Sequence, residues 1–254
     1  MNTWLDGAYD TFPLARMAYQ AAQRLEDPVL EAELARNLAM RFHLLNDHAA
    51  TEDHLQKSLA LFTSLGDLVG QSSVLRNQAH VAGRAGDHEL SDQLLRLATD
   101  LARKSNRPDI LAVGLAEWAA QLTVVEDWPS AVERGTECKA LIEEYGYIHL
   151  VPSAHCCLAE AYVRLGQFQE AIAVVREGLS LAGEDPQAHL ALNPYLAVAA
   201  ASSGDQDLAH GAIARFRMAQ ARFDSDQLNA TTEGSMDEWV SIVGEVEARL
   251  GAHA

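Results

Sequence analysis

The chain has 254 residues, of which 48% are hydrophobic but only 6% aromatic. Abundant alanine and leucine with few aromatic residues favour closely packed helices and argue against a β-rich fold. The formal net charge is -17, from 36 acidic and 19 basic residues. Such a chain repels phosphate backbones and anionic lipids, which argues against direct binding of nucleic acid or membranes.

Three cysteines are present, Cys138 and the adjacent pair Cys156 and Cys157. They do not form a disulfide framework, which points to a reducing compartment. The first ten residues contain neither a basic stretch nor an apolar run, so no signal peptide is expected. No apolar run reaches the length of a membrane span. We therefore expect a soluble cytoplasmic protein.

The N-terminal segment, residues 1–26, is predicted to form one helix. Its apolar positions have the spacing of a second repeat helix whose first helix is missing; they are Gly7, Tyr9, Phe12, Ala15 and Ala18. A half-repeat leaves an apolar face uncovered, because repeats bury surface only against their neighbours. We expect this face to be covered by a second copy of the chain, in a homodimer, or by an upstream domain that is missing here.

Residues 27–222 contain a two-residue break that recurs about every 40 residues, an interval typical of helical repeats. The breaks are Asn46-Asp47, Gly86-Asp87, Glu126-Asp127, Gly166-Gln167 and Gly204-Asp205. An alanine stands before each break, always at the same distance from it, at positions 39, 79, 119, 159 and 197. A small residue follows each break at an equally constant distance: Thr51, Ser91, Ala131, Ala171 and Ala209. This regularity predicts a stacked array of two-helix repeats.

The apolar spacing within each period predicts two helices of similar length. The expected ranges are 28–45, 48–64, 68–85, 88–104, 108–125, 129–145, 148–165, 167–182, 186–203 and 205–221. Prolines at first-turn positions mark several of the starts, for example Pro28 and Pro108. The segment 223–254 then reads as a polar loop followed by a helix. Ser235 and Glu238 form a candidate capping box, and this last helix is expected to cap the array.

These residues resemble tetratricopeptide repeats. The clearest match begins with Leu158-Ala159-Glu160-Ala161-Tyr162 and continues with Leu165-Gly166-Gln167-Phe168, then Ala171-Ile172. The long period resembles the extended form of the repeat found in large bacterial signal-transduction ATPases and transcription activators. The resemblance implies an all-α fold, a right-handed α-solenoid of five helix-turn-helix repeats with an N-terminal half-repeat and a C-terminal capping helix.

Catalytic and metal-binding motifs are not found in the sequence. There is no phosphate-binding Gly-rich loop followed by Lys and Ser or Thr, and no nucleophile elbow. His155, Cys156 and Cys157 are consecutive on one predicted helix, so their side chains diverge and cannot share one metal ion. We expect helix packing and a surface histidine there, with no cofactor and no metal. A redox-sensing role for the two cysteines is the alternative to buried structural thiols.

One polar constellation repeats with the array. Arg36-Asn37 and Arg76-Asn77 occupy equivalent places on two successive first helices, and Met40, His43 and His80 extend the same face. In tetratricopeptide repeat proteins this face lines the inner groove, where an asparagine commonly holds a peptide backbone. The groove is expected to become apolar toward a second end near Trp118, Cys156 and Tyr195. The alternative is that the two arginines are ordinary solvated residues.

The leading hypothesis is a non-enzymatic protein- or peptide-binding module, the scaffold or sensing part of a bacterial regulatory system. Its partner would be a protein or peptide that carries acidic groups. A second hypothesis is a small-molecule-binding protein or enzyme that uses the apolar groove end. An enclosed pocket with convergent polar groups would favour this second hypothesis, and an open groove the first. A third is a structural scaffold that assembles through its N-terminal helix.

Overall fold

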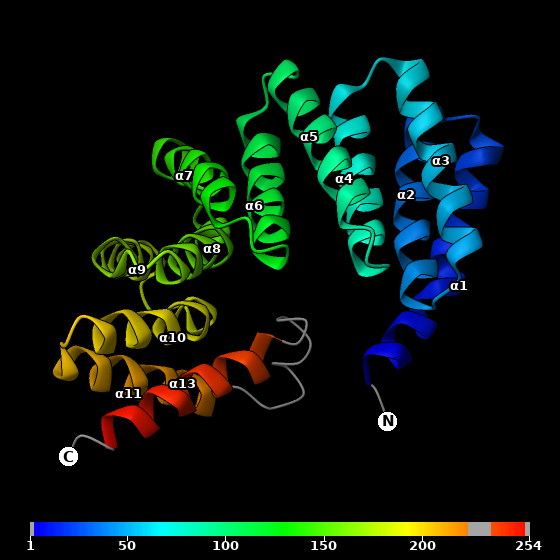
Figure 1. Ribbon diagram of the computed structural model, residues 1–254. Coiled ribbons are helices and arrows are strands. Elements are labelled where there is room, and N and C mark those ends of the chain that lie inside the picture. Colours follow the sequence, from blue (N-terminus) through cyan, green and yellow to red (C-terminus); the bar gives the residue numbers. More distant parts are fainter. Residues whose placement is uncertain (1–2, 223–234, 252–254) are drawn as a thin grey trace. The chain divides into compact units, whose positions relative to one another are not determined.

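The computed structural model describes residues 3–222 and 235–251, with side chains from residue 12 to 222 and from 236 to 251. Helices make up every regular element in these ranges (Figure 1). They are α1 (Thr3–Leu25), α2 (Pro28–Leu44), α3 (His48–Leu65), α4 (Leu68–Arg84), α5 (His88–Lys104), α6 (Pro108–Val124), α7 (Trp128–Tyr145), a 3-10 turn η1 (Ile148–Leu150), α8 (Val151–Arg164), α9 (Phe168–Ala182), α10 (Pro186–Ser202), α11 (Gln206–Arg222) and α13 (Ser235–Gly251). Among the described residues, no helix combines the length and apolar content needed to cross a bilayer. The predicted all-α fold of two-helix repeats is confirmed.

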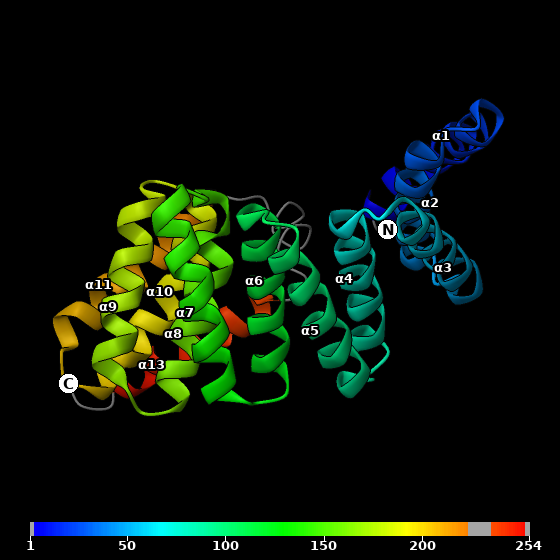
Figure 2. The same ribbon diagram turned by 90° about the horizontal axis from the view of Figure 1, so that it is seen from above.

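The chain divides into two compact units, residues 1–117 and 118–254, with the boundary inside α6. The first unit contains α1 to α5, in which α2 pairs with α3 and α4 pairs with α5. The second contains α7 to α13, and its neighbouring helices α8, α9 and α10 lie side by side in Figure 2. Each unit is therefore a stack of helical hairpins.

The predicted breaks end the first helix and start the second helix of each repeat. Their first residues all have positive φ, between 58° and 85°: Asn46, Gly86, Glu126, Gly166 and Gly204. This left-handed conformation ends a helix and satisfies its last carbonyl groups. Their second residues cap the next helix, since Asp47, Asp87, Asp127 and Asp205 each accept a backbone N–H bond of 3.0–3.3 Å. Gln167 provides no such side-chain bond.

The two columns of small residues are buried in every repeat. The alanines before the breaks are all at most 1% exposed, as are the small residues after them. Gly178 of α9 is a further close contact, since a Cβ there would lie 2.9 Å from Leu192 of α10 and 3.0 Å from His155 of α8. Small side chains at these positions let neighbouring helices approach closely.

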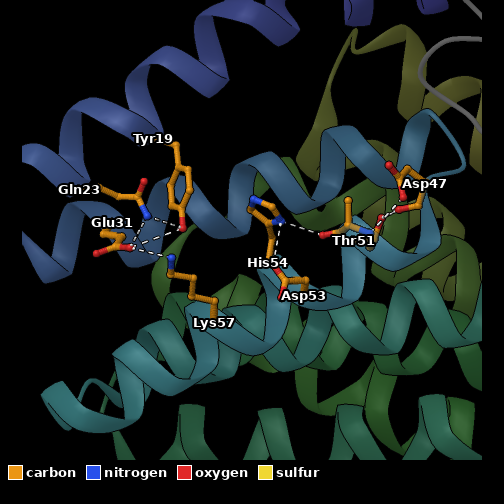
Figure 3. Close-up of polar contacts among 9 residues, drawn as sticks. Tyr19, Gln23, Glu31, Asp47, Thr51, Asp53, His54 and Lys57 are labelled. Atoms are coloured by element: carbon orange, nitrogen blue, oxygen red, sulfur yellow. Dashed lines mark hydrogen bonds and ion pairs between the residues drawn. The ribbon is translucent and has the colours of Figure 1, made fainter.

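The N-terminal helix α1 packs on α2, and hydrogen bonds between polar side chains connect the two helices. Figure 3 shows Tyr19 and Gln23 of α1 converging on Glu31 of α2, which Lys57 of α3 also reaches at 3.2 Å. The side of α1 away from α2 carries exposed Leu14, Met17 and Leu25, at 65%, 65% and 71%. Exposed apolar side chains thus lie on α1 from residue 12 onward, and the half-repeat stays a prediction. A homodimer through this face stays a prediction.

The predicted C-terminal helix is α13, which contacts α10 and α11 within the second unit (Figure 1). Its buried side chains form one stripe: Met236, Trp239, Val243, Val246 and Leu250. They join the core of α8 to α11, as a capping helix must. The loop 223–234 and the side chain of Ser235, and with it the predicted capping box, lie outside the described residues.

Replacing Ala159 by leucine should destabilise the protein, because this alanine is fully buried at a helix crossing. We expect a loss of about 1–3 kcal/mol in the free energy of unfolding, measured by chemical denaturation. Ala173→Leu on the exposed face of α9 is the matched control and should change stability little. Equal stability of both variants would contradict the assignment of the column.

Replacing Glu126 by glycine should stabilise the protein, because Glu126 has φ 59° and glycine adopts this region without steric cost. We expect a gain of about 0.5–1 kcal/mol by the same measurement. The reciprocal change, Gly86→Glu at the equivalent position, should lose a similar amount. A destabilised Glu126→Gly variant would show that the turn is held by the glutamate side chain instead.

Candidate functional site

The two arginines of the predicted groove lie on successive first helices of the first unit, Arg36 on α2 and Arg76 on α4. Both are half-buried. Burial lowers the pKa of the Arg36 guanidinium, Glu33 opposes this shift, and the positive charge of Arg76 adds to it. The two cations therefore lie near enough to repel each other, as the shared repeat position predicted.

Arg76 is held by an acidic residue of the next first helix. Its Nε and Nη2 donate to the two carboxylate oxygens of Glu117 on α6, each at 2.6 Å. This is a bidentate pair, the strongest geometry that an arginine and a carboxylate form. The Arg76 side chain is 15% exposed and that of Glu117 is 44% exposed. Sequence reasoning missed Glu117, although it stands one repeat after Asn77 in the same column.

The Arg76 side chain passes beside a glycine of α6. A Cβ on Gly114 of α6 would lie 3.8 Å from Arg76 Cδ and 3.5 Å from the Thr99 hydroxyl oxygen. Gly114 precedes Glu117 by three residues, so both are on one face of α6. The stem of Arg76 therefore lies over Gly114 while its head reaches Glu117.

Arg36 has no such anchor. Among the residues that the structure describes, none forms a hydrogen bond or an ion pair with its guanidinium. The negative charge of Glu33, one turn earlier on α2, favours the charged form of Arg36. The amide Nδ2 of Asn77 is likewise buried without a hydrogen-bond partner, whereas Asn37 is exposed. A half-buried cation and an unsatisfied amide donor thus lie on adjacent first helices.

The two histidines of the predicted groove contact each other. The rings of His43 on α2 and His80 on α4 are 5.5 Å apart in an edge-to-face arrangement. Met40, one turn before His43, is half-buried. The structure therefore brings together residues at equivalent repeat positions of α2 and α4. The polar end of the predicted groove lies within the first unit.

The residues that were expected to line the apolar end of the groove are largely buried instead. Trp118 is 7% exposed with the Arg134 guanidinium over its ring at 4.6 Å, and Tyr195 is 4% exposed. Cys156 donates to the Ala191 carbonyl oxygen at 3.6 Å. Trp118 and Tyr195 are therefore core residues of the second unit, with little surface left for a ligand.

The cap helix α13 shares a core cluster with Tyr195. Burial raises the pKa of Glu160 on α8, and the negative charge of Glu238 on α13 raises it further. The electrostatic influence of Glu238 also extends to Cys156 and Tyr195. The sequence predicted that the last helix caps the array. It did not predict that the first turn of this helix would lie near Cys156, Glu160 and Tyr195.

The expected surface histidine is buried. His155 is 0% exposed, and its Nδ1 lies 3.2 Å from the Val151 carbonyl oxygen. Burial, together with the charge of Lys139, lowers the pKa of His155 to about 4, so the ring is neutral at pH 7. The prediction was wrong because Gly178 of α9 opens space into which the ring packs. Burial likewise raises the pKa of Cys157 to about 12, which disfavours the reactive thiolate.

Comparison with known proteins agrees with this architecture. Residues 157–193 match a family model described as tetratricopeptide repeat. The search of curated protein sequences found no match. Among solved structures, BtubC from P. vanneervenii is similar with a TM-score of 0.74 at 17% identity, over 85% of this chain and 91% of that chain.

Two further structures share the fold. A Rap protein complexed with Competence and Sporulation Factor has a TM-score of 0.64 at 16% identity, over 98% of this chain and 72% of that chain. Kinesin light chain TPR-like repeats from Podosopora anserina have a TM-score of 0.61 at 19% identity, over 78% of this chain and 98% of that chain. Residues 157–193 thus match the tetratricopeptide repeat, and the helical pairs share the fold of solved tetratricopeptide-like repeat structures.

Proposed function

We propose that the protein is a non-enzymatic interaction module that binds a protein or peptide segment on the α2 and α4 face of its first unit. The observation that carries this proposal is Arg36, a half-buried guanidinium without an ion-pair partner among the described residues. A buried cation is costly unless an anion compensates it. A bound acidic group would supply that compensation.

The neighbouring groups suit an extended peptide. Asn77 has an amide donor without an acceptor, and Asn37 is exposed one repeat earlier. Asparagine side chains can donate to one backbone carbonyl and accept from one backbone N–H. His43, His80 and Met40 add apolar and aromatic surface beside them. Main-chain recognition with one or more acidic contacts is the binding mode that these residues support.

Charge supports selectivity for an acidic group at this place. With a net charge of -17, most of the protein surface repels anions. A local cation on such a surface is the preferred binding position for an anion, because the negative charge elsewhere on the surface repels the anion. Among proteins of the same fold, the solved Rap protein holds the Competence and Sporulation Factor. We infer a comparable binding role here, as the scaffold or sensing part of a bacterial regulatory system in the cytoplasm.

The small-molecule alternative at the apolar end has less support. Its expected lining residues Trp118 and Tyr195 are packed inside the second unit. No observation of the described residues favours a reaction there.

Partner binding should depend on Arg36 and weaken with salt. Partners are captured from a lysate of the source organism and identified by mass spectrometry, and the affinity of each candidate is then measured by calorimetry. Arg36→Ala should cost about 1–3 kcal/mol of binding free energy, because a charge-assisted contact is lost. Adding Arg76→Ala should weaken binding further, and raising salt should weaken binding of the wild type most.

The matched control is Arg96→Ala on α5, an exposed arginine paired within its own helix with Asp92. It removes the same charge from the same unit and should leave affinity unchanged. If the Arg36→Ala, Arg76→Ala double variant bound the captured partner as tightly as wild type, the proposed binding face would be wrong.

A further inference from the structure

We propose that the loop after α7 is a second interaction surface, at which Tyr145, Tyr147 and Glu144 bind an arginine side chain from a basic segment of a partner protein. This surface belongs to the second unit, whereas the α2 and α4 face belongs to the first. The two surfaces also differ in the sign of the charge that they attract.

The loop is built differently from the other connections between repeats. It is longer than the two-residue connection between α3 and α4, because it contains the 3-10 turn η1. Gly146 ends α7 with φ 73°, and the Ile148 N–H donates to the Gly146 carbonyl oxygen at 2.8 Å. The residues on either side of the glycine, Tyr145 and Tyr147, lie side by side.

These two tyrosines form a stacked aromatic pair at the surface. Their ring centroids are 5.7 Å apart and their planes differ by 12°. The His149 ring meets Tyr147 edge-on, with centroids 6.4 Å apart. Tyr145 is 49% exposed, and the neighbouring Ile148 is 42% exposed. Because the face of an aromatic ring is electrostatically negative, the pair offers a partner apolar contact area and attraction for a cation.

The neighbourhood of the pair is acidic. The Glu144 carboxylate raises the pKa of the Tyr145 phenol through a hydrogen bond and through its charge, so this carboxylate lies beside the ring. Lys139, earlier on α7, is held between Glu143 and Glu177, each at 2.6 Å. Two carboxylates thus surround one ammonium group, and Glu144 adds a further negative charge. This balance favours a cationic partner.

The protein itself shows how a ring and a carboxylate together hold a cation. The Arg134 guanidinium lies 4.6 Å from the centre of the Trp118 ring and 2.9 Å from the Glu133 carboxylate. The same combination holds a lysine in the first unit, in the group Lys57, Tyr19 and Glu31 (Figure 3). Among the residues that the structure describes, no lysine or arginine lies over the Tyr145 or Tyr147 ring. A cation from a partner fits there.

Arginine suits this surface better than lysine. Its planar guanidinium can stack on a ring and at the same time donate N–H bonds to a carboxylate. The ammonium group of lysine is a compact and more strongly hydrated charge. The expected contact is therefore a guanidinium on the Tyr145 ring, with the Glu144 carboxylate at the edge of the guanidinium.

The test is titration of the full chain, with isotope-labelled tyrosine side chains, by three blocked tripeptides. Acetyl-Gly-Arg-Gly-amide carries a guanidinium, acetyl-Gly-Lys-Gly-amide carries an ammonium, and acetyl-Gly-citrulline-Gly-amide is the neutral isostere of the first. The arginine peptide should shift the NMR signals of Tyr145 and Tyr147 saturably. The signal of Tyr19, which Lys57 already covers, should stay in place. The lysine peptide should bind about twofold to fivefold more weakly, and the citrulline peptide should cause no shift.

Two variants separate the ring from the carboxylate. Tyr145→Leu keeps an apolar side chain without the ring, and Glu144→Gln removes the negative charge. Each should lower the affinity for the arginine peptide by about twofold to fivefold, measured at the Tyr147 signal. Both residues are exposed, so the variants should fold like wild type. The matched control is Glu170→Gln in the first turn of α9, which removes the same charge from an exposed position of the same unit and should leave the affinity unchanged.

Three results would overturn the surface. The first is equal affinity for the arginine and citrulline peptides, and the second is unchanged affinity in Tyr145→Leu. The third is an equal loss in Glu144→Gln and Glu170→Gln, which would show only a general attraction between an acidic protein and a cation. If concentrating the protein alone shifted the Tyr145 signal, and Tyr145→Leu abolished that shift, the occupant would be a second copy of the chain and the partner segment would be wrong. None of these readouts depends on the α2 and α4 face.

Discussion

The close approach of paired helices is the constraint on which the rest of the structure depends. Alanine or another small residue at the crossing positions lets two helices pack almost backbone to backbone, and every member of the first two columns is at most 1% exposed. The left-handed residue at each break and the aspartate after it turn the chain within two residues. Because spacing and turn are both tight, the register between repeats stays nearly constant along the array.

This register aligns the residues of the proposed binding face. One column holds Arg36 and Arg76, and the next holds Asn37, Asn77 and Glu117. Arg76 donates two short hydrogen bonds to Glu117, whereas the position equivalent to Glu117 one repeat earlier is Asn77. The repeat therefore provides its own internal comparison.

Short-range patterns in the sequence predicted most of the fold. The expected helix ranges differ from the observed ends by only a few residues, because breaks, prolines and alanines act within a turn or two of the chain. Contacts between side chains from distant helices could not be predicted in the same way. The pairing of Arg76 with Glu117 joins residues 41 positions apart in the chain, and the burial of His155 depends on Gly178. To predict the burial of Trp118 and Tyr195, the direction in which each ring points must be known. The apolar pattern of the sequence does not give that direction. Glu117 could have been found by following the asparagine column one repeat further.

The most direct test of the account is the mobility of the two guanidiniums in the protein without a partner. Hydrogen exchange of the arginine Nε–H groups and rotation about their Nε–Cζ bonds can be measured by NMR on one sample. The account predicts slow exchange and hindered rotation for Arg76, which Glu117 holds through both Nε and Nη2. It predicts faster exchange and freer rotation for Arg36. Equal protection of the two groups would mean that Arg36 already has an anion within the protein, and the face would then have no vacant place for a partner's carboxylate.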